Sequence, residues 1–489
     1  MNIEKTVKNY SGKCSIDAMS KDDLYALHGS AVEVLRRTGM IIKDKEAVEI
    51  YADNGADVSK KNGDHLVKLP FSMVEKAIQD APSQIYLQGR KNGSSFSLRF
   101  GGEPRFAPFM NSIKIVDPAT RKIRPVTKED SIVATKILEH CDCVDLLRNP
   151  ITPVEVPAAT MPLHVAHSIF PYTTKPIQTI AFTQKEIRQL KELEAIVAKD
   201  LGEDPKPFII RTGSGSPLFM GKERCQPMIG SAREGQILGL GGMTMGGSTA
   251  PIDVAGNTVQ SIAEYLAQIT LVQLVRPGHP VFITSYISLM DLKAAVGLMA
   301  APENALGAIA IPKIFELYKI PCSCTFCSDS KWIDFQCGFE KAMMVMAGIM
   351  GGNSLMFGIG GLESGLLWDN SQALLDNEML RNLKFLFQGL EVTDETMSVD
   401  IIDEIGPMGN YFLAPSTLQK MRSTSSYEIM DRKARKDGYH TSPLQTIEIA
   451  NEKVNAMIEE LKDFSIVSEK CMRELDEFMA EAEKEALIQ

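Results

Sequence analysis

The segment that decides the fold reads FIIRTGSGSPLFMGKERCQPMIGSAREGQILGL, residues 208–240. It opens with a short apolar run, Phe208–Arg211, and continues through a loop rich in glycine and serine. A helical pattern over Lys222–Arg233 and a second apolar run, Gln236–Leu240, follow directly. A strand, a helix and another strand in this order predict two parallel strands joined by a crossover helix.

The same alternation runs from about Arg105 to Leu390. Beyond the two strands above, we expect strands near Ile113–Val116 (or Arg105–Phe109), Val144–Leu147, Ile177–Ala181, Val281–Thr284, Ser323–Phe326 and Leu355–Gly358. The expected helices are Lys128–His140, Met161–Ile169, Thr183–Ala198, Lys222–Arg233, Asp253–Val275, Glu303–Tyr318, Asp334–Met350 and Ser371–Phe387. This α/β pattern predicts a TIM (β/α)8 barrel. A doubly wound open sheet is the competing architecture, but no G-x-G-x-x-G or P-loop sequence follows an early strand.

The barrel has additions at both ends. We expect an N-terminal α+β cap over residues 1–102, the barrel over 103–390 and a C-terminal helical extension over 391–489. Apolar residues at helical spacing predict helices at Leu24–Thr38, Lys45–Ala52 and Pro70–Ala81 in the cap. Alternation predicts strands within Ile85–Phe100, and the stretch Thr446–Ile488 has a helical pattern.

Composition excludes several classes of protein. The 489 residues carry 52 Lys and Arg against 62 Asp and Glu, so the formal net charge is -10 and a broad nucleic-acid surface is not expected. No long uncharged apolar run predicts a membrane span, and the first ten residues lack the apolar core of a signal peptide. An odd count of 9 Cys indicates reduced thiols. We therefore expect a cytoplasmic protein.

In a TIM barrel the active site lies on the loops that follow the strands. Both tryptophans of the chain, Trp332 and Trp368, fall in such loops, after the seventh and eighth strands. Aromatic faces that meet at a barrel mouth bind quaternary ammonium groups well. The alternative is that two large side chains simply seal the top of the barrel.

Other loop residues offer polar and charged groups. The first loop contains Phe109 and Asn111, and Glu363 in the last loop would complement a cation. Arg211 and Lys331 are candidates for binding a substrate carboxylate. In the glycine-rich loops, Ser214, Gly246 and Gly247 either leave bare backbone for a large flat ligand or partner protein, or only permit tight turns.

Metal binding has weak support in the sequence. Cys322, Cys324 and Cys327 have spacings that can chelate zinc, but no histidine follows within reach, which favours buried reduced thiols. His164 and His167 lie on one predicted helix without an HExxH pattern, so we expect a structural role for them. We predict no metal site.

Four stretches together resemble the trimethylamine methyltransferase family: KPIQTIAF at 175–182, TGSGSPL at 212–218, GGMTMGGSTAPIDVAGN at 241–257 and FQCGFEKAMMVMAGIMGGNSLMFGIGGLESG at 335–365. The resemblance implies a TIM barrel that moves a methyl group from a methylated amine to the cobalt of a separate corrinoid protein. Founding members contain pyrrolysine, whereas this sequence has only Lys331 in that neighbourhood. It therefore resembles the non-pyrrolysine branch, whose members demethylate quaternary amines such as glycine betaine, proline betaine, carnitine or γ-butyrobetaine.

The resemblance also organises the candidate residues. It implies a cation cage of Trp332, Trp368, Phe109 and Phe357, with Glu363 and Asn111 as the polar residues that orient the substrate. Arg211 or Lys331 would hold a substrate carboxylate, and Ser214, Gly246 and Gly247 would let the corrin ring approach. No tightly bound cofactor is implied, because the partner supplies the corrinoid (cobalamin), and we expect the chain to form a homo-oligomer. Two alternatives stay open: a zinc-thiolate methyltransferase using Cys322, Cys324 and Cys327, and a non-catalytic partner that only docks on a corrinoid protein.

Overall fold

The computed structural model of the chain describes residues 15–16, 18–90, 93–421, 427–430 and 445–488. The first ten residues, where no signal peptide is predicted, lie outside this part. Its centre is a barrel of eight parallel strands, in the order β6-β17-β16-β14-β13-β11-β10-β9. Their bounds are β6 Arg105–Pro108, β9 Leu147–Arg148, β10 Ile177–Ile180, β11 Ile209–Arg211, β13 Ile237–Gly246, β14 Val281–Asp291, β16 Cys322–Thr325 and β17 Leu355–Ile359. The N–H of Asp145 donates to the carbonyl of Phe106 at 2.8 Å, which links the first strand to the last in this order and nearly closes the ring.

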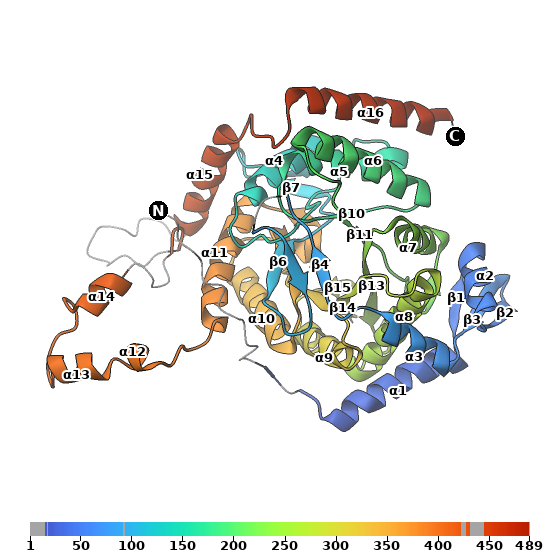
Figure 1. Cartoon of the computed structure of the whole chain (residues 1–489), viewed down its shortest axis with the longest axis horizontal. Coiled ribbons are helices and arrows are strands. Elements are labelled where there is room, and N and C mark those ends of the chain that lie inside the picture. The colour runs from blue at the N-terminus through green and yellow to red at the C-terminus, as the bar shows by residue number, and fades with distance from the viewer. Residues whose placement is uncertain (1–14, 17, 91–92, 422–426, 431–444, 489) are drawn as a thin grey trace.

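Helices surround these strands, as Figure 1 shows. They are α4 Lys128–Glu139, α5 Met161–His167, α6 Gln184–Leu201, α7 Lys222–Glu234, α8 Val254–Val275, α9 Pro302–Tyr318, α10 Phe335–Gly351 and α11 Asn370–Phe387. Each lies within a few residues of its prediction, and the TIM-barrel prediction is confirmed. The start of α6 shows why: the Thr183 hydroxyl accepts from the N–H of Glu186 at 3.1 Å, and the Glu186 carboxylate accepts from the N–H of Thr183 at 3.1 Å.

The first barrel strand is the second of the two predicted alternatives. β6 covers Arg105–Pro108, whereas Lys114–Val116 forms β7 of a different sheet. That sheet also contains β8 (Ile123–Pro125), β18 (Gly361–Leu362) and β19 (Leu367–Trp368). Both runs are apolar enough to be strands, and only the pairing of β6 with β17 places it in the barrel.

The N-terminal end of the barrel is closed by a hairpin of β4 (Ile85–Leu87) and β5 (Phe96–Leu98). Its apolar side chains form one buried cluster with inward-facing strand residues: Ile85, Leu87, Phe96, Leu98, Ala107, Leu146, Ile209, Ile237, Phe282, Leu355 and Phe357. Since Ile209, Ile237 and Leu355 each open their strands, this cluster fills the end where the strands begin. Access to the interior is therefore from the opposite, C-terminal end.

The cap packs on the barrel through a shared core. It contains α1 (Lys21–Arg37), α2 (Lys45–Asp53), α3 (Phe71–Asp80) and the strands β1 (Met40–Ile42), β2 (Asp57–Lys61) and β3 (Asp64–Lys68). A strand from the loop after β11, β12 (Phe219–Met220), pairs with β1. The Tyr51 hydroxyl donates to the carbonyl of Ala267 on α8 at 2.7 Å.

The C-terminal part leaves the barrel and returns to it. The short helices α12 (Asp394–Met397), α13 (Val399–Ile405) and α14 (Pro415–Lys420) stand apart from the barrel helices in Figure 1. The predicted helical stretch at the end is two helices, α15 (Gln445–Glu460) and α16 (Glu469–Ile488). On α5, His164 and His167 lie 2.9 Å from Glu483 and Asp476 of α16, which gives both histidines a structural role. Across the described part of the chain, every helix is too short or too polar to cross a membrane.

Candidate active site

The inner face of the barrel becomes polar above the apolar layer. Arg148 lies two residues after Leu146 and Arg211 two residues after Ile209, so both point to the interior, as their neighbours in the apolar cluster do. Gln178 is in register with Arg148 on the next strand. Three polar side chains from β9, β10 and β11 therefore line the C-terminal half of the interior.

Arg148 is fully buried and has no hydrogen-bond partner for Nε, Nη1 or Nη2 among the described residues. Its guanidinium carbon lies 4.0 Å from the centre of the Phe357 ring. Burial lowers the pKa of Arg148 to about 10, and Tyr286 and Arg211 act on it in opposite directions, Tyr286 raising and Arg211 lowering it. The side chain is thus still a cation at neutral pH.

Arg211 is partly buried beside Tyr286 of β14. Its guanidinium carbon lies 5.6 Å from the Tyr286 ring centre, and its Nη1 donates to the carbonyl of Thr212. Burial lowers the pKa of Arg211, while the neighbouring Tyr286 raises it. Tyr286 therefore lies beside both guanidinium groups.

Glycines of β13 make room for these polar side chains. A Cβ at Gly239 would lie 3.1 Å from the Gln178 amide nitrogen, and one at Gly241 would lie 2.9 Å from Nη2 of Arg211. Any other residue at Gly241 would also come within 2.6 Å of the Thr284 carbonyl oxygen. The glycines of β13, the fifth barrel strand, thus leave room for the polar side chains of the neighbouring strands.

An aromatic and sulfur-containing cluster lies at the mouth. Phe109, Met299 and Cys327 are buried together, and Tyr286 packs against them. Asp329 holds the surrounding loops, because its carboxylate accepts from the N–H of Met299 at 2.8 Å and from the Ser364 hydroxyl at 2.7 Å. The loops after β14, β16 and β17 are therefore tied to one another around the cluster.

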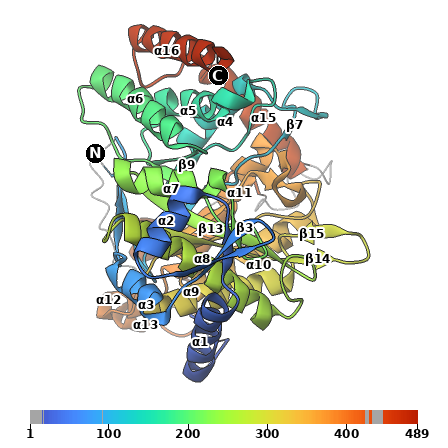
Figure 2. The ribbon, with the colours of Figure 1, turned by 90° about the vertical axis from the view of Figure 1, so that its right-hand side faces the viewer.

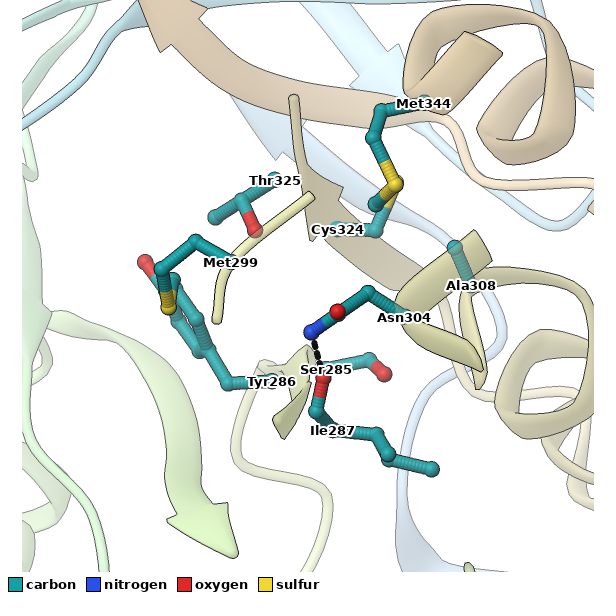
Figure 3. Close-up of a pocket in the computed structure, with 9 residues that line it drawn as sticks. All are labelled: Ser285, Tyr286, Ile287, Met299, Asn304, Ala308, Cys324, Thr325 and Met344. Atoms are coloured by element: carbon teal, nitrogen blue, oxygen red, sulfur yellow. Dashed lines mark hydrogen bonds between the residues drawn. The ribbon is translucent and has the colours of Figure 1, made fainter. Parts of the chain in front are cut away.

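A small cavity adjoins Tyr286, as Figure 3 shows. Its volume is about 10 Å³, room for about one water molecule. Tyr286, Met299 and Thr325 line it together with residues of α9 and α10, and the Asn304 amide donates to the carbonyl of Ile287 at 2.6 Å. The barrel wall beside Tyr286 is thus not completely filled.

The two tryptophans have opposite environments. Trp332 is 66% exposed, whereas Trp368 is 0% exposed and donates from Nε1 to Asn370 at 2.8 Å. The Trp368 ring lies where a Cβ at Gly360 would be. Among the described residues no aromatic contact joins the two rings, so the structure does not bring them together as a cage.

The other predicted substrate residues are also spread out. Phe109 lies in the mouth cluster, but the face of Phe357 is covered by Arg148. Lys331 is exposed and donates to the carbonyl of Asp329 at 3.1 Å. Of the predicted residues, the structure therefore brings Arg211 and Phe109 to the neighbourhood of Tyr286.

The predicted orienting residues lie on the rim. Asn111 is exposed, and its Oδ1 accepts from the Asn149 amide at 2.8 Å. Glu363 forms an ion pair with Lys114 at 3.5 Å, and its φ of 50° places it in the left-handed region. Both residues thus stand at the C-terminal end of the barrel, outside the buried polar group.

The residues predicted to face a corrin ring have contacts of their own. The Ser214 hydroxyl lies 3.0 Å from the Glu264 carboxylate and 3.0 Å from the Gln268 amide nitrogen. A Cβ at Gly246 would lie 3.1 Å from the Asn257 amide nitrogen, so this glycine permits close packing. Gly247 is exposed with a φ of 83°, a turn conformation that favours glycine.

The cysteines of the zinc alternative are buried thiols. Burial raises the pKa of both Cys324 and Cys327 to about 12, so neither is a thiolate at neutral pH. Within the described ranges, no group of three or more His, Cys, Asp and Glu side chains is placed to hold a metal ion. The zinc-thiolate alternative has no ligand set there.

Three candidate site residues, Arg148, Gln178 and Tyr286, are not among those expected from the sequence. Arg148 ends β9 as Arg211 ends β11, whereas Gln178 is the second residue of β10 and Tyr286 lies in the middle of β14. The sequence signal for Arg148 is the run DLLRNP at 145–150. There an arginine directly follows the apolar residues of a strand. β14 continues to Asp291, beyond the predicted end at Thr284, so Tyr286 is a strand residue that faces the interior.

Comparison with known proteins agrees with this architecture. Residues 2–486 match the family model described as trimethylamine methyltransferase (MTTB). The trimethylamine methyltransferase MttB of Desulfitobacterium hafniense is 33% identical over 423 residues, covering 86% of this chain and 84% of that protein. An L-carnitine:corrinoid methyltransferase of Eubacterium limosum is 27% identical over 452 residues, covering 86% and 88%.

A solved structure shows the same fold. The monomethylamine methyltransferase MtmB of Methanosarcina barkeri has a TM-score of 0.54 at 13% sequence identity, covering 92% of this chain and 90% of that chain. The resemblance noted in the sequence is thus confirmed along nearly the whole length. The chain is a methyltransferase and belongs to the trimethylamine methyltransferase family.

Proposed function

We propose that the chain transfers a methyl group from a quaternary amine to Co(I) of a cognate corrinoid protein. Glycine betaine, proline betaine, carnitine and γ-butyrobetaine are the substrates that we expect. The carnitine:corrinoid methyltransferase among the relatives supports this class of substrate. Corrinoid, carried by the partner, supplies the methyl acceptor.

The chemistry makes modest demands on the protein. When the C–N bond breaks, its electron pair stays on nitrogen, so a quaternary ammonium leaves as a neutral tertiary amine without a general acid. The enzyme has to orient the N–CH₃ bond and exclude water. An interior with two arginines, an amide and a phenol, beside the cluster of Phe109, Met299 and Cys327, is consistent with such a role.

One observation carries the proposal: the barrel mouth is ringed by exposed apolar side chains. Loops, strand ends and one helix start contribute these side chains: Ile113, Val154, Met243, Ile252, Leu292, Val296, Trp332, Phe335 and Leu366. Figure 2 shows the hairpin of β14 and β15 (Val296–Leu298), which carries two of them, projecting from the barrel. Exposed apolar groups gathered on one face indicate a protein-binding surface. We refer to this ring as the apolar rim and propose that the corrinoid protein docks on it.

The test is an assay with a panel of betaines and free cob(I)alamin, followed by absorbance. We expect methylcobalamin to form with at least one betaine, and faster when the cognate corrinoid protein replaces free cob(I)alamin. Association with the corrinoid protein but no methylation with any quaternary amine would establish the non-catalytic alternative instead.

Trp332 separates docking from substrate binding. On the apolar rim, Trp332→Ala should slow methylation of the corrinoid protein while leaving the rate with free cob(I)alamin unchanged. If Trp332 is a cage residue, its substitution should slow both reactions by more than tenfold, because cation–π energy of about 1.4 kcal/mol or more would be lost.

We assign Glu363, at the same end of the barrel, as the acid that faces the ammonium group.

We also propose that the chain forms a homo-oligomer through its extension. Residues 385–421, which include α12, α13 and α14, expose apolar side chains: Phe385, Leu386, Leu390, Val392, Met397, Val399, Ile402, Met408, Tyr411, Phe412, Leu413, Leu418 and Met421. None of the side chains of α12, α13 or α14 is buried. An arm of this composition needs a protein surface to cover it, and we propose that a second copy of the chain supplies that surface. Light scattering should show that Phe412→Asp with Leu413→Asp lowers the molecular mass in solution, and an unchanged mass would contradict the proposal.

A further inference from the structure

Arg148 is a fully buried cation whose guanidinium nitrogens, Nε, Nη1 and Nη2, have no hydrogen-bond partner among the described residues. Burying a guanidinium without hydrogen bonds costs several kcal/mol, so buried charges in proteins are ordinarily paired. The guanidinium lies 4.0 Å from the centre of the Phe357 ring, with Tyr286 beside it. A bound anion would supply the hydrogen-bond acceptors that this cation lacks.

The groups around Arg148 are suited to the same anion. Gln178, in register with it, is fully buried, and neither of its amide atoms has a hydrogen-bond partner. Arg211 adds a second positive charge, and Tyr286 lies beside both guanidinium groups. Gly239 and Gly241 leave room for the Gln178 amide and the Arg211 guanidinium, because a Cβ at Gly239 would lie 3.1 Å from the first group and one at Gly241 would lie 2.9 Å from the second. Two cations and an unpartnered amide thus line one part of the interior.

We propose that Arg148 and Arg211, with the Gln178 amide, bind the carboxylate of a zwitterionic substrate inside the barrel. This inference rests on the proposed function for the other end of the substrate, its quaternary ammonium. A carboxylate matches the planar fork of arginine, which donates two parallel N–H bonds. The three free nitrogens of Arg148 supply that fork.

The position of the arginines sets the direction of the substrate. The hairpin of β4 and β5 closes the N-terminal end, so the substrate enters from the mouth with its carboxylate leading. The two positive charges repel the ammonium group, which remains near Phe109 and Met299 of the mouth cluster. Its methyl groups then face the apolar rim, where the corrinoid protein docks. A methylated amine without a carboxylate gains none of this binding energy.

Binding of two probes to the full-length protein tests the site without any turnover. The first is 3,3-dimethylbutanoate, which has the shape and carboxylate of glycine betaine but no charge at the ammonium position. The second is choline, which has the ammonium group but no carboxylate. We expect the acid to bind, measured by calorimetry and by a rise in Tm, and choline to bind at least about 30-fold more weakly than glycine betaine.

Arg148→Met removes the charge and keeps the length of the side chain. We expect this variant to bind 3,3-dimethylbutanoate at least about 30-fold more weakly, with Arg148→Lys recovering part of the affinity as a point charge. Arg36→Met is the matched control, because Arg36 is an exposed residue of α1 paired with Glu33. Its affinity for both probes should equal that of the unmodified protein.

The outcomes separate this inference from the proposed function. Equal binding of the acid to the Arg148→Met variant and the unmodified protein would overturn the carboxylate site, and so would equal use of choline and glycine betaine as methyl donors. Arginine-dependent binding of the acid supports the site even if no betaine methylates cob(I)alamin, in which case the proposed function alone fails. A variant with a lower Tm in the absence of any probe, and with unchanged probe affinity, would assign Arg148 to structure.

Discussion

Two buried cations of this barrel, Lys341 and Arg148, differ in whether the chain supplies them with hydrogen-bond partners. Lys341 of α10 is 0% exposed and forms an ion pair with Asp376 of α11 at 2.7 Å. It also donates to the carbonyl of Gly358 at 2.8 Å, and Asp376 accepts from the N–H of Gly360 at 2.8 Å. Arg148 is equally buried, but its guanidinium has no hydrogen bond among the described residues.

This difference in pairing indicates that Lys341 stabilises the fold and that Arg148 serves to bind a ligand. The pair of Lys341 and Asp376 is complete within the chain and fastens the end of β17 to two helices. Arg148 faces the interior, where a ligand can complete its hydrogen bonds. Because an unpaired buried charge is costly, its presence in a stable fold indicates that it is kept for binding.

The largest expected effect is on the paired cation. Lys341→Met leaves the buried carboxylate of Asp376 without its counter-ion, which should lower the free energy of unfolding by about 3–5 kcal/mol. Urea denaturation measures this loss. The double variant Lys341→Met/Asp376→Leu should regain most of it, since no charge is then stranded. A loss below about 1 kcal/mol in the single variant would remove the contrast with Arg148.

The two tryptophans allow a second comparison, between a buried ring and an exposed ring. Trp368→Ala empties a fully buried site and should cost about 3–5 kcal/mol of unfolding free energy. Trp332→Ala, at an exposed position, should change it by less than about 0.5 kcal/mol. Chemical denaturation of both variants checks this, and similar losses would show that the exposed ring packs more than its position indicates.

Two histidines illustrate a third way to bury a titratable group, which is to keep it neutral. Burial lowers the pKa of both His167 and His279 to about 4, against about 6.5 in an unfolded chain. The unfolded state therefore takes up more protons between these values, so stability is complete above pH 6.5 and falls as the pH drops toward 4. We expect a loss of roughly 1–3 kcal/mol per histidine across this range.

Urea denaturation at several pH values between 7 and 4 measures that slope. His279→Gln should flatten the curve, because the amide replaces the group that takes up the proton. A curve as steep as that of the unmodified protein would assign the pH dependence to other groups.

The smallest expected effect is on the unpaired cation. In the absence of ligand, Arg148→Met should leave the free energy of unfolding within about 1 kcal/mol of its original value or raise it, because no partner loses a hydrogen bond. Denaturation curves with and without 3,3-dimethylbutanoate should differ for the unmodified protein and coincide for the variant. A loss as large as that of Lys341→Met would show that Arg148 is structural.

Much of the fold could be predicted from local patterns. Helix α6 begins where its capping box predicts, and β14 begins at the predicted Val281. The site was harder to predict: Arg211 was a candidate from the end of its predicted strand and Phe109 from its loop, but Arg148 and Tyr286 were not candidates. Which strand side chains meet inside the barrel depends on the register of neighbouring strands. The cage of the two tryptophans stays a prediction. The structure encloses Trp368 beside Gly360 and Asn370 and leaves Trp332 exposed, a difference that depends on the folded loop.

The sequence by itself determined the order of strands and helices, the end of the barrel that carries the loops, and membership of the family. These follow from periodicity, caps and motifs, which depend on residues close together in the chain. The tertiary structure decided whether β6 or β7 enters the barrel, which tryptophan is exposed, and that Arg148 is buried without a partner. Burial and pairing depend on contacts between residues far apart in the sequence, and a linear pattern carries no direct record of them.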